Sequence, residues 1–500
     1  MPIRTILIAA AVAAVMPATA VAQTTGDPAR SAEAAASAVR PAVTTRHSGV
    51  FNGRRLRYSA SVETLAVRTD EGRRGAEIVS YAYTSDEAAS PERPVVFLFN
   101  GGPISPSVYL HMGLGPRRVA FPDDLNAPTS TYRLVDNPHA PLDAADLVFV
   151  DPASTGFSRV APGVEPEAFF SVREDAAQFT AFIREWLRLH GREGSPVYIL
   201  GESYGTNRAA EIARQFAESD RPETLAGVFL YGQAVNVVEY AQRPANLTSY
   251  VASLPTIAAT AYYHGKAEPR GRSFEQFMEE AAVFAKGPYL SALYKGSDIT
   301  AAEKADVARD LQAFSGLSAD WYLRHDLKIS KEDYRLELFR DEGLLLGRSD
   351  TRYRAPLTDQ GGRPDPSDVV PAAMISHFGV YLRDELKVTW PEPYVTQSPV
   401  KGLGAWTWGE GDVAGPFGDW PYYVGLQKMM ARNPDFRLVI GNGYYDTLTT
   451  VGAAEMLATQ YGLDPARTRL RFYDGGHMGY SIDAVVVALS DDIRRLVGAR

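Results

Sequence analysis

Cysteine is absent from this chain, and its absence excludes several kinds of chemistry. Without cysteine the protein has no disulfide, no thiolate nucleophile and no lipid-modified N-terminal cysteine. A basic excess is also missing, because 51 Lys and Arg stand against 60 Asp and Glu and give a formal net charge of −9 at pH 7. Proteins that bind nucleic acid usually carry a basic excess. We therefore predict no nucleic-acid partner.

Long apolar segments are rare as well. The run Ile6–Met16 follows a short basic start and is too short to span a bilayer. Ala20–Ala22 has the A-x-A form of a cleavage site, so we predict a signal peptide over 1–22 and a mature chain beginning at Gln23. An uncleaved anchor is the alternative, and Pro17 with the polar residues behind it argues against this. No later segment is long and apolar enough to predict a membrane span after cleavage. An exported protein without disulfides is typical of a bacterial periplasm or growth medium.

The pattern of residues changes along the chain and predicts three parts after the signal peptide. Residues 23–46 are rich in Ala, Ser and Thr, as in a flexible leader. Alternating stretches beginning at His47 predict an antiparallel meander, and continuous apolar runs then alternate with helical patterns. This alternation predicts a mostly parallel central sheet with helices on both faces, built from 47–239 and 405–500. Between these sections, 240–404 has amphipathic helical pieces and few strand patterns, which predicts an inserted helical cap.

Particular elements follow from length and periodicity. Strands buried on both faces are predicted at Val95–Phe99 and Leu147–Val150, and further strands at Val197–Leu200, Val228–Tyr231, Arg437–Ile440 and Arg469–Phe472. Helices are predicted after the capping-box sequence Ser171–Glu174 and at Phe274–Phe284, Ala301–Leu311 and Ala484–Val497.

The pentapeptide Gly201–Gly205, Gly-Glu-Ser-Tyr-Gly, lies between one of these apolar runs and a helix-compatible stretch. Strand, tight turn and helix are the context in which G-x-S-x-G lifts a serine hydroxyl above a sheet. The helix N-terminus there favours developing negative charge. The pentapeptide alone is a weak signal, since an ordinary glycine-bounded turn has the same form. In this context it predicts Ser203 as a nucleophile.

A serine nucleophile needs a base and a carboxylate that orients the base. Folds with this elbow carry them in the order Ser, Asp, His, each behind a strand. Asp446 follows the predicted strand that ends at Ile440, and His477 follows the strand that ends at Phe472. Of eight histidines, only His477 lies beyond Asp446. The sequence thus predicts Asp446 and His477 as partners of the serine, with Asp474 as a second choice for the carboxylate.

The sequence Asn100–Pro103, Asn-Gly-Gly-Pro, directly follows another predicted strand. Glycines allow backbone N–H groups to point at a developing oxyanion. We predict the N–H groups of Gly102 and Tyr204 as the two donors, Tyr204 being the residue after the nucleophile. A plain turn is the alternative interpretation of this loop.

At this point the chain resembles the serine carboxypeptidase family, within the α/β-hydrolase fold. The likeness rests on four blocks: Asn100–Pro103, Asp151–Ser158, Gly201–Gly205 and the segments around Asp446 and His477. The cysteine-free, exported form resembles the bacterial branch. The resemblance implies removal of residues from a peptide's C-terminus through an acyl-enzyme, without metal or other cofactor. It also implies that Asn100, Gly101 and Glu202 bind the terminal carboxylate of the substrate.

The chain departs from the family pattern around this site. Ile104 stands where the family usually has glycine, and Pro106 lies in the same loop. Glycine adopts a positive φ without strain, whereas a β-branched residue such as isoleucine does not. Gly113 stands where many relatives have a glutamate that shares a proton with the elbow glutamate, and Thr450 replaces a usual proline. These departures bear on oxyanion geometry, on an acid pH optimum and on strict carboxypeptidase action.

The resulting hypothesis is an exported α/β-hydrolase that acts as a serine carboxypeptidase on peptides. One alternative keeps the chemistry and makes the protein an esterase or acyltransferase on small acyl substrates. A second alternative is a catalytically silent hydrolase-fold protein that binds a peptide or another partner. Side-chain preference and oligomeric state do not follow from the sequence.

Overall fold

A twisted sheet organises the computed structural model, which describes residues 40–68, 74–87, 90, 92–221, 225–357, 365–409 and 420–498. The predicted signal peptide and most of the predicted leader lie outside these residues. The described residues from 40 onward form one compact unit.

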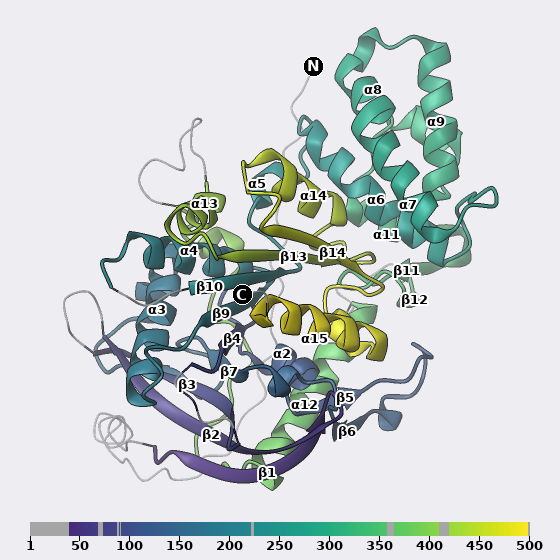
Figure 1. Cartoon of the computed structure of the whole chain (residues 1–500). Helices are drawn as coiled ribbons and strands as arrows, with labels where there is room; N and C mark the ends of the chain where they lie inside the picture. The colour runs from purple at the N-terminus through teal and green to yellow at the C-terminus, as the bar shows by residue number, and fades with distance from the viewer. Residues whose placement is uncertain are drawn as a thin grey trace, which may run out of the picture. The chain divides into compact units, whose positions relative to one another are not determined.

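Within the described ranges the main sheet has ten strands in the order β1-β2-β3-β7-β4-β9-β10-β13-β14, with β8 paired to β3 (Figure 1). The pairs from β1 to β7 are antiparallel, and those from β7 through β4, β9, β10 and β13 to β14 are parallel. The strands are β1 Val43–Phe51, β2 Arg54–Arg68, β3 Arg74–Ser85, β4 Val95–Phe99, β7 Asp146–Asp151, β8 Arg159–Val160, β9 Val197–Glu202, β10 Leu225–Tyr231, β13 Arg437–Gly443 and β14 Thr468–Tyr473. Two small hairpins pair β5 Arg117–Ala120 with β6 Arg133–Asp136, and β11 Leu344–Leu346 with β12 Arg354–Pro356.

Helices cover both faces of this sheet (Figure 1). The helices of the described ranges are α2 Val108–Leu114, α3 Val172–Leu189, α4 Gly205–Glu218, α5 Val237–Tyr240, α6 Leu247–Tyr263, α7 Phe274–Phe284, α8 Leu290–Lys295, α9 Ala301–Ser315, α10 Ala319–Arg324, α11 Lys331–Glu337, α12 Val369–Asp384, α13 Tyr423–Arg432, α14 Val451–Gln460 and α15 Asp483–Gly498, of which α6 to α11 form a cluster of their own beside the sheet layers. None of the helices in these ranges is both long and apolar enough to cross a membrane.

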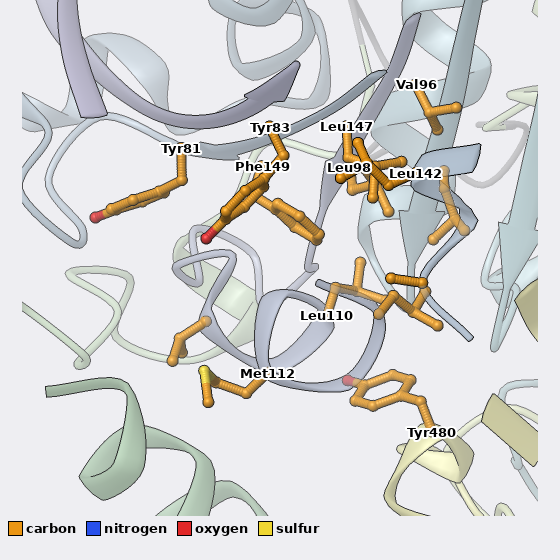
Figure 2. Packing of buried hydrophobic residues seen from close by; sticks show 14 of the residues in the cluster. Tyr81, Tyr83, Val96, Leu98, Leu110, Met112, Leu142, Leu147, Phe149 and Tyr480 are labelled. Carbon is orange, nitrogen blue, oxygen red and sulfur yellow. The ribbon is translucent and has the colours of Figure 1, made fainter. Parts of the chain in front are cut away.

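The two hydrophobic cores lie on opposite faces because successive residues of a strand point to opposite sides. In β4, Val96 and Leu98 belong to the cluster with α2, α12 and α15, whereas Phe97 and Phe99 belong to the cluster with α3, α4 and α13. Figure 2 shows the first cluster, in which strand residues pack against Leu110 of α2. The predicted α/β-hydrolase architecture is confirmed: a mostly parallel sheet lies between two helical layers.

Two predicted boundaries need correction. Strand β1 begins at Val43 and pairs with β2 from that residue, so the end of the predicted leader 23–46 is part of the sheet. Helix α12 lies within the predicted cap 240–404, yet its apolar residues pack in the core cluster with α2. The cluster formed by α6 to α11 is separate and includes Tyr445 of the core. Hydrophobic periodicity identified α7 and α9 as helices, but it could not show which layer each helix of the region would join.

Candidate active site

Ser203 occupies the sharp turn between β9 and α4. Its φ is +58°, in the left-handed region that side chains other than glycine rarely adopt. Glycines stand two positions away on either side because the turn has no room there for larger residues: a Cβ on Gly201 would lie 2.2 Å from the carbonyl oxygen of Gly205. The backbone N–H of Ser203 donates to the carbonyl of Tyr231 at 2.9 Å, at the end of neighbouring β10. The turn therefore has the backbone geometry of a nucleophile elbow and lies at the carboxyl edge of the sheet.

His477 and Asp446 meet behind the ends of β14 and β13. The imidazole Nδ1 lies 2.6 Å from Asp446 Oδ2, and both side chains are buried. Asp446 also accepts hydrogen bonds from the N–H groups of Leu448 and Thr449 and from the Thr449 hydroxyl, at 2.8, 3.1 and 2.5 Å. These donors hold the carboxylate in place to accept from Nδ1–H, which leaves the Nε2 lone pair free to take a proton.

The pKa of His477 reflects this pairing. Burial lowers the pKa of His477. The charge of Asp446, the hydrogen bond to Asp446 and the carboxylate of Glu202 together raise the pKa by a larger amount. The net result is a pKa above the ordinary value of 6.5. An imidazole with a raised pKa is a stronger general base once it is deprotonated.

The imidazole and the serine come to the same strand end. A Cβ on Gly232 would lie 3.1 Å from Cε1 of His477, and Gly232 directly follows Tyr231, which holds the Ser203 N–H. Within the described part of the chain no hydrogen bond joins Ser203 Oγ to the imidazole. Hydrogen bonds of this kind are often long before substrate binds. Sequence order predicted the three residues, and the fold brings them to one edge.

Asp474, the second choice for the orienting carboxylate, has a different neighbour. Burial, then the hydrogen bond to Asp474 and then its charge raise the pKa of the Tyr445 hydroxyl. The hydrogen bond to the imidazole comes from Asp446.

The two predicted oxyanion donors are adjacent. A Cβ on Gly101 would lie only 2.5 Å from the backbone nitrogen of Tyr204, so the Asn-Gly-Gly-Pro loop packs directly on the elbow. Gly102 has a φ of +111°, which glycine adopts without strain. Neither Gly102 nor Tyr204 donates its N–H to an acceptor among the residues that the structure describes. Two unpaired donors beside a nucleophile suit an oxyanion.

A buried ion pair holds these two elements together. Arg208 of α4 donates from Nη1 to the carbonyl of Asn100 at 2.8 Å and from Nε to Asp175 of α3 at 2.7 Å. The hydroxyl of Tyr204 donates to the same carboxylate at 2.9 Å. Arg208 and Asp175 are both fully buried. The cluster fixes the loop and the elbow relative to each other.

Ile104 adopts a strained backbone conformation with a positive φ. Its φ is +53° and its side chain is fully buried. The surrounding loop is strongly held: Ser105 N–H donates to the carbonyl of Gly101 at 3.0 Å, and Asp151 accepts from the N–H and the hydroxyl of Ser107, each at 2.7 Å. Strained residues persist where their surroundings determine the backbone in this way. The loop thus keeps a positive φ here although the residue is β-branched.

Glu202 lies buried beside the nucleophile. Asn100 Nδ2 donates to Oε2 of Glu202, and the hydroxyl of Tyr480 lies 3.0 and 2.8 Å from the two carboxyl oxygens. Burial raises the pKa of Glu202 to about 7, although the nearby His477 and the donated hydrogen bonds oppose the rise. Glu202 is therefore close to half-protonated at neutral pH.

Two residues of the site were not predicted from the sequence. Tyr480 follows His477 by three positions, and nothing in the sequence shows that it returns to Glu202. Lys331 of α11 places its Nζ 3.4 Å from the carbonyl of Leu448, beside Asp446. Burial lowers the pKa of Lys331 to about 8. Only long-range packing reveals these two contacts. Among the described residues no group of three or more His, Asp or Glu could hold a metal ion.

Comparison with known proteins agrees with this geometry. The serine carboxypeptidase family model matches residues 73–267. Over this stretch the chain is similar to serine carboxypeptidases. The matched stretch holds the Asn-Gly-Gly-Pro loop and Ser203 but ends before Asp446 and His477, so for these two the geometry above stands alone.

Individual relatives match part of the chain. Serine-type carboxypeptidase F of Aspergillus niger is 27% identical over 164 residues, which cover 32% of this chain and 29% of that protein. Pheromone-processing carboxypeptidase kex1 of Aspergillus niger is 34% identical over 143 residues, covering 28% and 21%. The chain thus matches less than a third of the length of these relatives. Both are fungal, and the bacterial branch stays a prediction.

A solved structure can be compared over most of the chain. It is Kex1(delta)p, a prohormone-processing carboxypeptidase from Saccharomyces cerevisiae, and the comparison covers 87% of this chain and 91% of that one. The TM-score is 0.49 and the sequence identity is 13%.

Proposed function

We propose that this protein is a serine carboxypeptidase that hydrolyses the C-terminal bond of peptides. The observation that carries the proposal is the 2.6 Å contact between His477 and Asp446, at the sheet edge that also presents Ser203 on a strained elbow. The similarity to serine carboxypeptidases over residues 73–267 supports it.

The proposed reaction follows from the geometry. Ser203 Oγ attacks the scissile carbonyl carbon while Nε2 of His477 takes the hydroxyl proton. Asp446 holds the imidazole and stabilises its positive charge. The N–H groups of Gly102 and Tyr204 receive the oxyanion. His477 then gives the proton to the leaving amine, and a water molecule, activated by the same imidazole, hydrolyses the acyl-enzyme.

The proposed recognition of a free carboxyl terminus uses Asn100, Gly101 and Glu202. Glu202 can donate a hydrogen bond to a substrate carboxylate only when it is protonated, and its pKa of about 7 keeps a substantial protonated fraction at neutral pH. Asn100 already donates a hydrogen bond to Glu202 and begins the loop that carries Gly102. Selection of C-termini then depends on a neutral carboxyl group beside the nucleophile.

Mass spectrometry of a defined peptide mixture tests the reaction class. Stepwise shortening from the C-terminal end is expected, and internal cleavage or no cleavage would contradict the proposal. Ser203→Ala is the matched control. Labelling of the wild-type protein, but not of Ser203→Ala, by a fluorophosphonate probe would exclude the catalytically silent alternative.

A second candidate function is that of an esterase or acyltransferase on small acyl groups. Two observations favour it: Ile104 occupies the strained loop, and Asn100 and Glu202 are only 3% and 1% exposed. Little of these two side chains is open to a substrate carboxylate in this conformation. Release of amino acids from N-blocked dipeptides, compared with hydrolysis of p-nitrophenyl esters, separates the two functions.

We also propose that the protein is exported to a bacterial periplasm or growth medium. The support is the sequence of residues 1–22 and the absence of cysteine. Fractionation of a bacterial host, with N-terminal sequencing of the product, tests both export and cleavage before Gln23.

A further inference from the structure

We propose that Tyr480 is a positioning residue that holds the Glu202 carboxyl group and thereby sets the pH range in which the site accepts a free C-terminal carboxylate. The inference rests on the proposed function, since it assigns Glu202 to carboxylate recognition. It adds a residue that no motif in the sequence marks.

The hydroxyl of Tyr480 lies within hydrogen-bonding distance of both carboxyl oxygens of Glu202. It lies 3.0 Å from Oε1 and 2.8 Å from Oε2, and neither Tyr480 nor Glu202 is appreciably exposed. The only other side-chain donor to Glu202 among the described residues is Asn100. Burial and the nearby Glu202 keep the pKa of Tyr480 well above 10, so its hydroxyl stays protonated and available as a donor.

Tyr480 reaches this position because α2 leaves room for its ring. A Cβ on Gly113 would lie 2.2 Å from Cδ2 of Tyr480, which is too close for two non-bonded carbon atoms. Figure 2 shows the ring of Tyr480 beside the helix that carries Leu110 and Met112. Glycine at 113 and tyrosine at 480 therefore form a complementary pair, small against large.

The ring also links two parts of the site. Tyr480 lies in the short turn Gly479–Ser481, directly behind His477, and the N–H of Gly479 donates to the hydroxyl of Tyr231 at 3.0 Å. Glu202 directly precedes Ser203. The hydrogen bond from Tyr480 to Glu202 thus joins the loop of the general base to the elbow of the nucleophile.

The sign of the effect follows from the direction of the hydrogen bond. A hydroxyl that donates to a carboxylate stabilises the ionised form and lowers its pKa. Burial raises the pKa of Glu202 and the hydrogen bond from Tyr480 lowers it, and the resulting pKa is about 7. Without this hydroxyl Glu202 becomes a weaker acid and stays protonated to higher pH. Cleavage that needs neutral Glu202 then extends to higher pH.

The test is the pH profile of Tyr480→Phe on a peptide with a free C-terminus and on its C-terminally amidated counterpart. The alkaline limb of kcat/KM for the free peptide is expected to move up by roughly 0.5 to 1 pH unit, the size of one hydrogen bond. The profile for the amidated peptide is expected to stay in place. An unchanged or lowered limb for the free peptide, or an equal shift for both peptides, would overturn the proposal.

Two further variants control for structural damage. Tyr473→Phe removes another buried hydroxyl from the same cluster, one that donates to Asp492 and not to Glu202, and should leave the limb in place. Gly113→Ala forces the Tyr480 ring away from its present position and should shift the limb in the same direction as Tyr480→Phe. Melting temperatures show that each variant is folded.

A readout independent of activity separates this inference from the proposed function. Isotope-edited infrared spectroscopy follows the protonated carboxyl stretch of Glu202, identified by its loss in Glu202→Gln. Tyr480→Phe should raise the pKa found in this titration even if no peptide is cleaved. An inactive protein with that shift would refute the carboxypeptidase assignment alone, whereas a Glu202 pKa unchanged by the substitution would refute the role of Tyr480.

Discussion

At the scale of single residues, the chemistry depends on a few side chains whose surroundings change their properties. Ser203 is held at positive φ, the imidazole of His477 is paired with Asp446, and the carboxyl of Glu202 is buried. In an unfolded peptide each of these side chains has its usual geometry and pKa. Strain, pairing and burial give them the geometry and the pKa values that acyl transfer needs.

The first prediction concerns the triad. Asp446→Asn should lower kcat by roughly 10⁴-fold, because an amide favours the wrong tautomer of the imidazole. Ser203→Ala should lose activity to a similar or larger extent while melting near the wild-type temperature. Asp474→Asn is the matched control, since Asp474 lies beside Tyr445 instead of the imidazole, and should retain most activity. Comparable losses in both Asp variants would contradict the assignment.

The second prediction concerns pH. The pKa of His477 is raised above 6.5, so kcat/KM should rise with pH as the imidazole loses its proton. The pKa of Glu202 is raised to about 7, and a free-carboxylate peptide should lose kcat/KM as pH rises through that value. Because the two groups interact, both limbs report the coupled pair. A narrow bell is expected for free peptides and a simple rise for amidated ones, and steady-state kinetics between pH 5 and pH 9 decide this.

At the scale of secondary-structure elements, the site depends on how strand ends and helix starts are held together. Strands β4, β9, β10, β13 and β14 are parallel neighbours, so the loops at their carboxyl ends meet at one edge. The buried pair Arg208–Asp175 then fixes α4 and α3 beneath the loop after β4.

The third prediction tests this pair. Arg208→Met leaves Asp175 buried without its partner and should lower the free energy of unfolding by about 3–5 kcal/mol. It should also lower kcat, because the carbonyl of Asn100 loses its donor next to the oxyanion site. The control is Arg214→Met in the same helix, whose Arg214–Glu211 pair is partly exposed and is worth about 1 kcal/mol or less. Chemical denaturation and turnover measure the two effects, and equal losses in both variants would contradict the argument.

At the scale of the whole molecule, the residues before α12 reach back to the catalytic loops. The N–H of His477 donates to the carbonyl of Ser349 at 2.6 Å, and the hydroxyl of Thr447 donates to the carbonyl of Arg348 at 2.6 Å. A Cβ on Gly476 would lie 2.4 Å from Cβ of Asp350. The inserted region therefore holds the loop that carries the general base.

The fourth prediction follows from this close approach. Gly476→Ala must displace residues 349–350 or the His477 loop, so it should lower both the melting temperature and kcat. Gly379→Ala is the matched control, because Gly379 is exposed within α12 and has no neighbour within 4 Å of an added Cβ. Alanine there should raise the free energy of unfolding by about 0.5–1 kcal/mol and leave kcat unchanged. Full kcat in folded Gly476→Ala would argue against a role for this contact.

The sequence predicted the strands around the site because their physics is local. Apolar runs marked β4, β7, β9 and β10, shorter mixed stretches marked β13 and β14, and periodicity marked α7 and α15 within a few residues. Within the meander predicted from His47 onward, the long stretch Arg54–Arg68 forms one strand, β2. Helix α12 was assigned to the cap because it lies within 240–404, where strand patterns are few, and the sequence did not show which core its helices would join.

What the sequence by itself determined is the set of local patterns: the elbow at Ser203, the glycines of the loop at Asn100, and the order in which Asp446 and His477 follow. These depend on backbone sterics and on short spacings, which neighbouring residues decide. Only the tertiary structure decided that Asp446 and not Asp474 bonds to the imidazole, that Tyr480 bonds to Glu202, and that Arg208 supports the oxyanion loop. Those contacts join residues far apart in the chain or turned back through a loop, and their energies come from burial that exists only once the layers have packed.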